Sequence, residues 1–333
     1  MTVTLKHVAE RAGVSRSAVS RCFTEGASIS AGTRAKVERA AVELGYCPNV
    51  LARSLTTRST RLIGLVSNNF HNPVFLQIFD LFTRGLQDRG LRPLLVNLSE
   101  ETDPARSVRM LRQYSVDGVI VASSTLPGGF ARAFREAGMP VVHAFGRPAG
   151  RPDVHVVGID NIACGRIAAA TLIGRGYARL GFLGGPEAAS TTQDRMAGFL
   201  AEVSRHPGTG TVIRFAEAYS FDAGRAAMQA GLAEGCFAEA WFCGDDVLSL
   251  GAISALRDAG LSVPGDVGVI GLNDMDMAGW AGVALTTIHQ PFAGIIAASI
   301  DLVAAMLDDP ARAPVSRIFP CRVVERGTLR APP

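Results

Sequence analysis

The stretch TLKHVAERAGVSRSAVSR, residues 4–21, decides the fold at the start of the chain. Its apolar residues recur at helical spacing behind Thr4, which is a good N-cap, so they predict a helix from about Leu5 to Ala12. Gly13 ends this helix, and Ser15 can cap a second one. Two short helices joined by a tight turn with a glycine predict a helix-turn-helix.

The second helix has an apolar face and a polar face. Its inward positions are Ala18, Val19 and Cys22, and its outward positions are Arg16, Ser17, Ser20 and Arg21. A third helix, predicted over residues 31–44 behind Ser30, completes the unit. An ordinary three-helix bundle with a solvated charged face would share this pattern. Arginine early in the second helix also suits DNA, because that end of a recognition helix reaches base edges in the major groove.

The positive charge of the chain is concentrated at its start. The 333 residues include 33 Lys and Arg against 30 Asp and Glu, a net charge of +3. Residues 1–61 hold ten of the basic and four of the acidic residues, so this segment carries +6 and the remainder −3. A basic head on a mildly acidic body is typical of a nucleic-acid-binding unit attached to another domain.

The composition excludes several classes of protein. With 48% hydrophobic residues, the chain has enough apolar surface to exclude a disordered scaffold or a disulfide-stapled miniprotein. Its six cysteines form no C-x-x-C pair, which favours free thiols in a reducing compartment. We see no secretory signal and no continuously apolar stretch of 18 residues, so we expect a cytoplasmic protein without a membrane span.

Beyond residue 61, short apolar runs alternate with helical stretches. The predicted strands are 62–66, 94–97, 117–122, 140–145, 180–183, 211–215, 239–243 and 267–271, and the predicted helices are 74–89, 104–114, 128–137, 161–175, 191–204, 222–234 and 246–259. This alternation predicts an α/β fold with parallel sheets covered on both faces. The run LIGLVSNNF at 62–70 is echoed by LGFLGGPE at 180–187, which suggests two similar doubly wound subdomains with a cleft between them.

The loops of this body carry no recognisable catalytic motif. We find no G-x-x-x-x-G-K-[ST], no G-x-S-x-G and no H-E-x-x-H. The pair Asp245-Asp246 could be a metal or acid/base site, but we interpret Asp246 as a helix N-cap. The run NDMDMAG at 273–279 resembles a calcium loop, yet Ala278 and Leu285 stand where ligands are needed. We therefore predict no enzyme activity, no metal and no cofactor.

At its head the chain closely resembles the lactose-repressor (LacI/GalR) family of bacterial regulators. The resemblance rests on residues 4–21, on TR at 33–34 and on LGYCPN at 44–49. It implies a homodimer on a near-palindromic double-stranded DNA operator, with Arg16, Ser17 and Arg21 reading the major groove. It further implies phosphate or capping contacts from Ser15, Ser30, Thr33 and Asn49.

The segment from Asn49 to Arg61 is too short to be a stable helix on its own. By resemblance it is a hinge helix that orders on the operator. Leu55 would then wedge a base step in the minor groove, and Ala52 would allow two copies to approach closely. A flexible tether is the alternative.

The body resembles the effector-binding core of the same family, which is similar to periplasmic sugar-binding proteins. The runs that carry this resemblance include VDGVIV at 116–121, FCGDDVLSLGA at 242–252, LTTIHQP at 285–291 and VVERGT at 323–328. The implied effector-binding residues are Asn68, Phe75, Arg147, Arg195, Tyr219, Asp245, Asn273 and Gln290. A surface ion pair for Arg195 and core packing for Tyr219 are the alternatives, and we favour core positions for His143 and Phe145.

These residue types suit a polyhydroxylated small molecule, because carboxylate and guanidinium groups bind adjacent hydroxyls. Asn273 stands where the family often has aspartate. An amide there removes a negative charge and adds a donor, which favours a sugar acid or a phosphorylated sugar; a neutral sugar stays open.

The expected organisation is a headpiece at 1–48, a hinge at 49–61 and an effector-binding and dimerisation core at 62–333. The core would consist of one subdomain from about 62–160 plus 291–320 and another from about 161–290 plus 321–333. The expected function is a transcriptional regulator, by default a repressor, whose operator affinity a carbohydrate effector controls. A solute-binding protein or a sugar-handling enzyme on the same fold is the competing interpretation.

Overall fold

The computed structural model describes residues 3–24, 26–47, 59–68, 70–98, 103–126 and 128–333. The chain divides into two compact units, residues 1–60 and 61–333. We call them the headpiece unit and the core unit and describe each by itself.

The headpiece unit contains the three predicted helices, α1 (Leu5–Ala12), α2 (Arg16–Cys22) and α3 (Ala31–Leu44), which confirms the bounds expected for the first and the third. The side chain of Ser15 accepts a hydrogen bond from the Ala18 amide, and that of Ser30 accepts one from the Thr33 amide, both at 3.2 Å. These caps satisfy amides that lack a helical partner. A small apolar core, to which Val8, Val19 and Val37 contribute, holds the three helices together.

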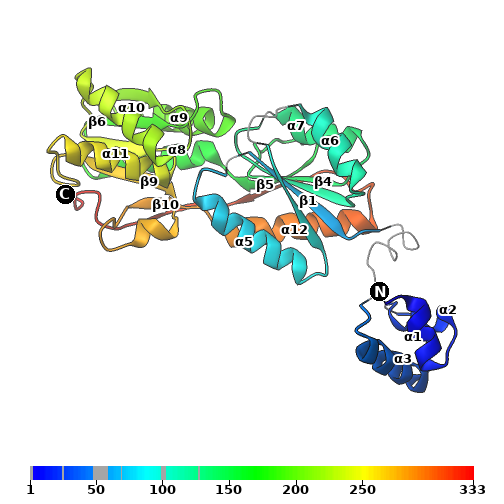
Figure 1. Cartoon of the computed structure of the whole chain (residues 1–333). Coiled ribbons are helices and arrows are strands. Elements are labelled where there is room, and N and C mark those ends of the chain that lie inside the picture. The colour runs from blue at the N-terminus through cyan, green and yellow to red at the C-terminus, as the bar shows by residue number, and fades with distance from the viewer. Residues whose placement is uncertain (1–2, 25, 48–58, 69, 99–102, 127) are drawn as a thin grey trace. The chain divides into compact units, whose positions relative to one another are not determined.

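The core unit consists of two lobes, each built on a six-stranded sheet (Figure 1). Lobe one has the parallel strand order β11-β5-β4-β3-β1-β2. Its strands are β1 (Leu62–Ser67), β2 (Arg92–Asn97), β3 (Gly118–Ala122), β4 (Val141–Ala144), β5 (His155–Ile159) and β11 (Ser316–Phe319). Its helices are α5 (Val74–Gln87), α6 (Pro104–Gln113), α7 (Gly128–Glu136) and α12 (Phe292–Asp308).

Lobe two has the order β12-β10-β9-β8-β6-β7 and is parallel except for the edge pair β10 and β12, which is antiparallel. Its strands are β6 (Arg179–Gly184), β7 (Gly210–Phe215), β8 (Ala240–Cys243), β9 (Gly268–Asn273), β10 (Thr287–His289) and β12 (Arg322–Val324). Its helices are α8 (Asn161–Gly174), α9 (Ser190–Val203), α10 (Phe221–Ala233) and α11 (Asp246–Asp258), with a 3₁₀ turn η1 (Asp276–Gly279).

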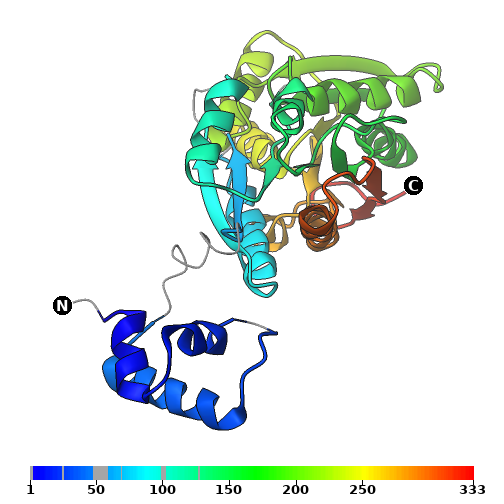
Figure 2. The ribbon, with the colours of Figure 1, turned by 90° about the vertical axis from the view of Figure 1, so that its right-hand side faces the viewer.

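Both faces of each sheet are covered, as the buried strands require. In β8, Phe242 points into the large apolar cluster that extends through both lobes, whereas Trp241 and Cys243 point into a separate cluster on the other face. The chain passes between the lobes three times: from β5 to α8, from β10 to α12 and from β11 to β12 (Figures 1 and 2).

The predicted alternation of strands and helices is confirmed, and most element ends lie within two residues of their predicted positions. Strand β5 and every element after β9 were not predicted from the sequence. Helix α12 is apolar around most of its circumference, with nine buried residues among its 17, so it shows little amphipathic period. Strands β10 and β12 have three residues each, too few to show alternation.

Candidate functional site

A pocket of about 490 Å³, counting its open mouth, lies in the core unit where the strands of the two lobes end. Its wall follows the carboxyl ends of the parallel strands, the position at which such sheets bind ligands. The residues that line it are Asn72, Val74, Phe75, Ile78, Ser124, Phe145, Ile159, Asn161, Thr191, Arg195, Tyr219, Asp245, Asn273, Gln290 and Phe292.

The buried carboxylate of Asp245 joins the two lobes. Its Oδ2 accepts hydrogen bonds at 2.9 Å from Asn72 of lobe one and from Asn273 of lobe two. Its Oδ1 accepts one from the Val247 amide, also at 2.9 Å, so Asp245 is the N-cap of α11. The interpretation of Asp246 as that cap is therefore wrong: Asp246 is the first helical residue, and its carboxylate accepts from the Met275 amide and the Thr287 hydroxyl.

Arg195 is the cation of the pocket. Its side chain is buried, its Nε donates to Asn161 Oδ1 at 2.9 Å, and its Nη1 donates to the Gly244 carbonyl. The surface ion-pair alternative for this residue is therefore wrong. Two glycines allow α8 and α9 to pack closely and so position Arg195. A Cβ atom on Gly165 of α8 would lie 2.0 Å from the Arg195 carbonyl oxygen, and a Cβ atom on Gly198 of α9 would lie 1.9 Å from the Ile162 carbonyl oxygen. The backbones of the two helices can approach this closely only because neither residue has a side chain.

Burial raises the pKa of two adjacent carboxyl groups. The pKa of Asp245 rises to about 6, because desolvation outweighs its hydrogen bonds and the nearby Arg195. The pKa of Asp246 rises to about 7, through desolvation and the negative charges of Asp245 and Asp274. At neutral pH Asp245 is therefore mostly ionised, whereas Asp246 is partly protonated.

The Asp246→Asn substitution is expected to flatten the dependence of stability on pH. The folded-state pKa of Asp246 lies above its ordinary value, so the protonated Asp246 contributes to the stability of the fold at pH 4. This contribution to the free energy of unfolding, roughly 4 kcal/mol at most, is lost as pH rises to about 7. Urea unfolding at pH 4.5 and 7.5 measures the difference. Asp258→Asn, at the exposed end of the same helix, is the matched control and should retain the wild-type slope. An equal slope in Asp246→Asn would contradict the assignment.

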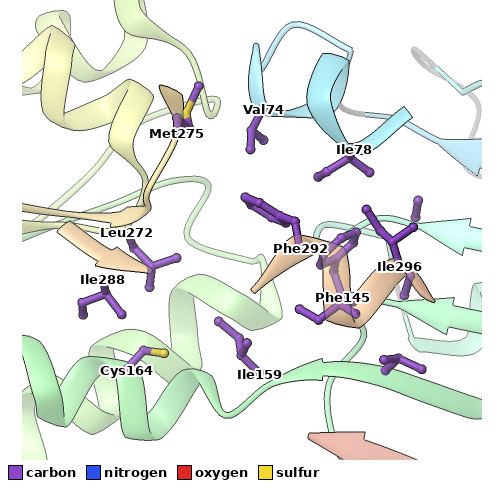
Figure 3. Packing of buried hydrophobic residues seen from close by; sticks show 14 of the residues in the cluster. Val74, Ile78, Phe145, Ile159, Cys164, Leu272, Met275, Ile288, Phe292 and Ile296 are labelled. Carbon is purple, nitrogen blue, oxygen red and sulfur yellow. The ribbon is translucent and has the colours of Figure 1, made fainter. Parts of the chain in front are cut away.

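Aromatic and aliphatic side chains form the apolar wall of the pocket. Val74 and Ile78 of α5 lie opposite Phe145 and Phe292, whose ring centroids are 6.0 Å apart in an edge-to-face arrangement (Figure 3). Phe145 is buried, as expected of a core residue, and also lines the pocket. Such a wall suits the apolar face of a ring.

Tyr219 is both a core residue of lobe two and a residue of the pocket wall. Its hydroxyl lies 2.8 Å from Thr192 Oγ1 and 3.3 Å from Thr191 Oγ1. His143 is buried, with Nε2 2.9 Å from the Ser123 carbonyl oxygen, and burial lowers its pKa.

The structure brings most of the predicted effector residues together. Those that line the pocket are Phe75, Arg195, Tyr219, Asp245, Asn273 and Gln290. Asn68 and Arg147 are not among its lining: Asn68 accepts hydrogen bonds from Ser123 and Thr125, and Arg147 pairs with Asp194 and is 61% exposed. The polar residues that the sequence analysis missed are Asn72, Ser124, Asn161 and Thr191. Ser124 lies two residues after the end of β3, which was predicted, and could have been found by that position alone, whereas Asn161 follows β5, which was not predicted.

The predicted DNA-reading residues lie on one helix of the headpiece unit. Arg16, Ser17 and Arg21 are exposed on α2, opposite its buried residues Val19 and Cys22. Ser15, Ser30 and Thr33 take part in the capping hydrogen bonds of α2 and α3. Asn49, Ala52 and Leu55, the residues predicted for the hinge, lie outside the described residues.

Two features are absent from the described residues. They contain no group of three or more His, Cys, Asp and Glu side chains that could hold a metal ion. None of the helices in that part of the chain is long and apolar enough to cross a membrane.

A helix-turn-helix unit and a two-lobed core with a pocket at the strand ends define a DNA-binding transcriptional regulator of the periplasmic-binding-protein-like kind. Residues 4–49 match the family of bacterial regulatory proteins described as the lacI family, and residues 169–329 match the periplasmic binding protein-like domain. The chain is 34% identical over 299 residues to the transcriptional regulator CelR of Thermobifida fusca, covering 86% of this chain and 87% of CelR. It is 33% identical over 294 residues to the transcriptional repressor PurR of Proteus mirabilis, covering 86% and 85% of the two chains. The chain belongs to the lacI family of bacterial regulators.

Solved structures agree with this assignment. The lac repressor dimer bound to operator and the anti-inducer ONPF superimposes with a TM-score of 0.89 at 26% identity, over 99% of this chain and 100% of the other. A CelR–cellobiose complex gives a TM-score of 0.73 at 29% identity, over 98% and 99%. Because these relatives are regulators, the alternatives of a sugar-handling enzyme and of a solute-binding protein are not supported.

Proposed function

We propose that this regulator is a homodimeric repressor whose affinity for a near-palindromic operator is controlled by a carbohydrate bound in the core-unit pocket. The observation that carries the proposal is the lining of that pocket, where a buried guanidinium, a buried carboxylate and four amide side chains face phenyl rings. Such a surface offers hydrogen bonds to hydroxyls and an apolar wall to the face of a sugar ring. The assignment as a repressor and a dimer draws on the similarity to the repressor PurR and to the lac repressor dimer.

Within this proposal we favour a neutral sugar over a sugar acid or phosphorylated sugar. The amide donor of Asn273, expected to favour an anionic ligand, is bound to Asp245. Arg195 is the single Lys or Arg among the lining residues, and Asp245 lies close enough to affect it electrostatically. An added anionic group would therefore lack a counter-charge of its own. The CelR–cellobiose complex shows that a relative binds a neutral disaccharide.

The proposed switch uses the three crossings between the lobes. A ligand that contacts both lobes favours one arrangement of them, and only such differential affinity can shift the equilibrium. Asn72 and Asp245 already join the lobes through one hydrogen bond. For the chain as a whole we retain the division into a headpiece at 1–48, a hinge at 49–61 and a core at 62–333 as part of the proposal.

A thermal-shift screen of the full chain against neutral sugars, polyols, sugar acids and sugar phosphates tests this function. We expect a neutral sugar to raise the unfolding temperature and to change the affinity for an operator duplex selected from random sequences. Stabilisation by sugar acids or sugar phosphates alone would overturn the choice of a neutral ligand. A chemical change in the added sugar would overturn the proposed function.

A further inference from the structure

A second pocket lies at the opposite end of lobe one, beside the amino ends of β4, β5 and β11. It has a volume of about 760 Å³, counting its open mouth, and shares no lining residue with the first pocket. Its lining residues are Arg135, Gly138, Met139, Pro140, Val141, Val154, His155, Met306, Pro310, Ala311, Arg312 and Pro314. It therefore combines an apolar wall with two arginines and one histidine.

His155, the first residue of β5, lines this pocket, is 2% exposed and has a ring nitrogen without a hydrogen-bond partner. Its Nδ1 accepts a hydrogen bond from the Val315 amide at 3.2 Å, so the proton of the neutral ring lies on Nε2. Nε2 is buried and has no hydrogen-bond partner among the described residues. A buried donor without an acceptor destabilises the fold, and a bound acceptor would remove that cost.

The charged groups that act on the His155 ring are all positive. Burial lowers its pKa first, and Arg312, Arg317 and Arg135 lower it further. In the part of the chain that the structure describes, no carboxylate forms an ion pair with any of these three arginines. Arg135 does donate to the backbone carbonyl of Asp153. The ring therefore stays neutral at pH 7 as a donor, in a region of positive potential that an anion would neutralise.

We propose that this second pocket binds the phosphate or carboxylate group of a small metabolite. One anionic oxygen accepts a hydrogen bond from His155 Nε2, the guanidinium groups of Arg135 and Arg312 neutralise the charge, and the apolar part of the molecule packs against Met139 and Met306. The proposal does not depend on the carbohydrate assigned to the first pocket. The regulator thus has a second binding site for a small molecule.

Calorimetric titration of the full chain with inorganic phosphate, phenyl phosphate and benzoate tests the proposal. We expect one saturable site per chain, with phenyl phosphate binding more tightly than inorganic phosphate because its ring reaches the apolar wall. Tighter binding of benzoate than of phenyl phosphate would identify carboxylates as the preferred source of the anion. Arg312→Gln and His155→Phe are each expected to weaken binding roughly tenfold.

Arg132→Gln is the matched control, since Arg132 lies on α7 one turn before Arg135, pairs with Glu136 and does not line the pocket. It should bind like the wild type. If His155→Phe does not fold, the affinity of Arg312→Gln, a substitution at an exposed residue, tests the proposal. The proposal is overturned if no probe binds saturably, if Arg312→Gln binds like the wild type, or if Arg16→Ala in the headpiece removes the binding instead.

Discussion

Replacing Arg16 with alanine is expected to weaken binding of the full chain to its operator by about 30-fold or more. Arg16 is exposed at the first position of α2, the end of a recognition helix that reaches base edges. A bidentate contact to guanine contributes about 1 to 3 kcal/mol, and the proposed dimer would lose two of them. Fluorescence anisotropy with an operator duplex and with a scrambled duplex of equal length measures the effect.

Arg39→Ala removes the same charge from the exposed surface of α3 and is the control for Arg16→Ala. It should weaken binding to the operator and to the scrambled duplex by the same small factor, because a phosphate contact carries no sequence information. Equal effects of the two substitutions on both duplexes would show that Arg16 does not read bases.

Replacing Arg195 with methionine is expected to weaken binding of the effector sugar by about 30-fold or more, with little change in operator affinity in the absence of sugar. Arg195 is buried in the pocket wall, where the loss of a hydrogen-bonded charge costs about 2 to 5 kcal/mol. Titration with the sugar identified in the screen measures the loss. A thermal unfolding curve establishes that the variant is folded, and Arg195→Lys serves if it is not.

Arg147→Met is the informative comparison for Arg195→Met. The family resemblance implied both arginines as effector ligands, but Arg147 is 61% exposed, pairs with Asp194 and does not line the pocket. We expect less than about a threefold change in sugar affinity for Arg147→Met, because Arg147 lies outside the pocket wall and only its partner Asp194 is buried. A loss as large as that of Arg195→Met would mean that the pocket extends to Arg147 when the sugar is bound.

The headpiece helices could be predicted from the sequence because their determinants are local. A cap such as Ser15 or Ser30 acts on an amide three residues away, and the stripe of Val37, Ala40 and Ala41 repeats within one helix. The segment around Leu55 was predicted by resemblance alone, and the described residues do not include it.

The alternation of strands and helices in the core was equally readable, since each buried strand is a short apolar run between polar loops. The elements after β9 could not be predicted in this way. Helix α12 is buried on most sides, and β10 and β12 are short strands that are recognised by their pairing in the sheet and not by their sequence pattern.

By itself the sequence determined the helix-turn-helix, the two-lobed α/β architecture and the family, all of which depend on spacings within a few turns or on whole motifs. Only the tertiary structure decided which side chains meet. Asn72 and Asp245 are 173 residues apart yet hydrogen-bonded, whereas Arg147 lies outside the pocket wall that Arg195 helps to form. Ends of parallel strands converge in space whatever their separation along the chain, so the composition of both pockets depends on strand order, which no local pattern specifies.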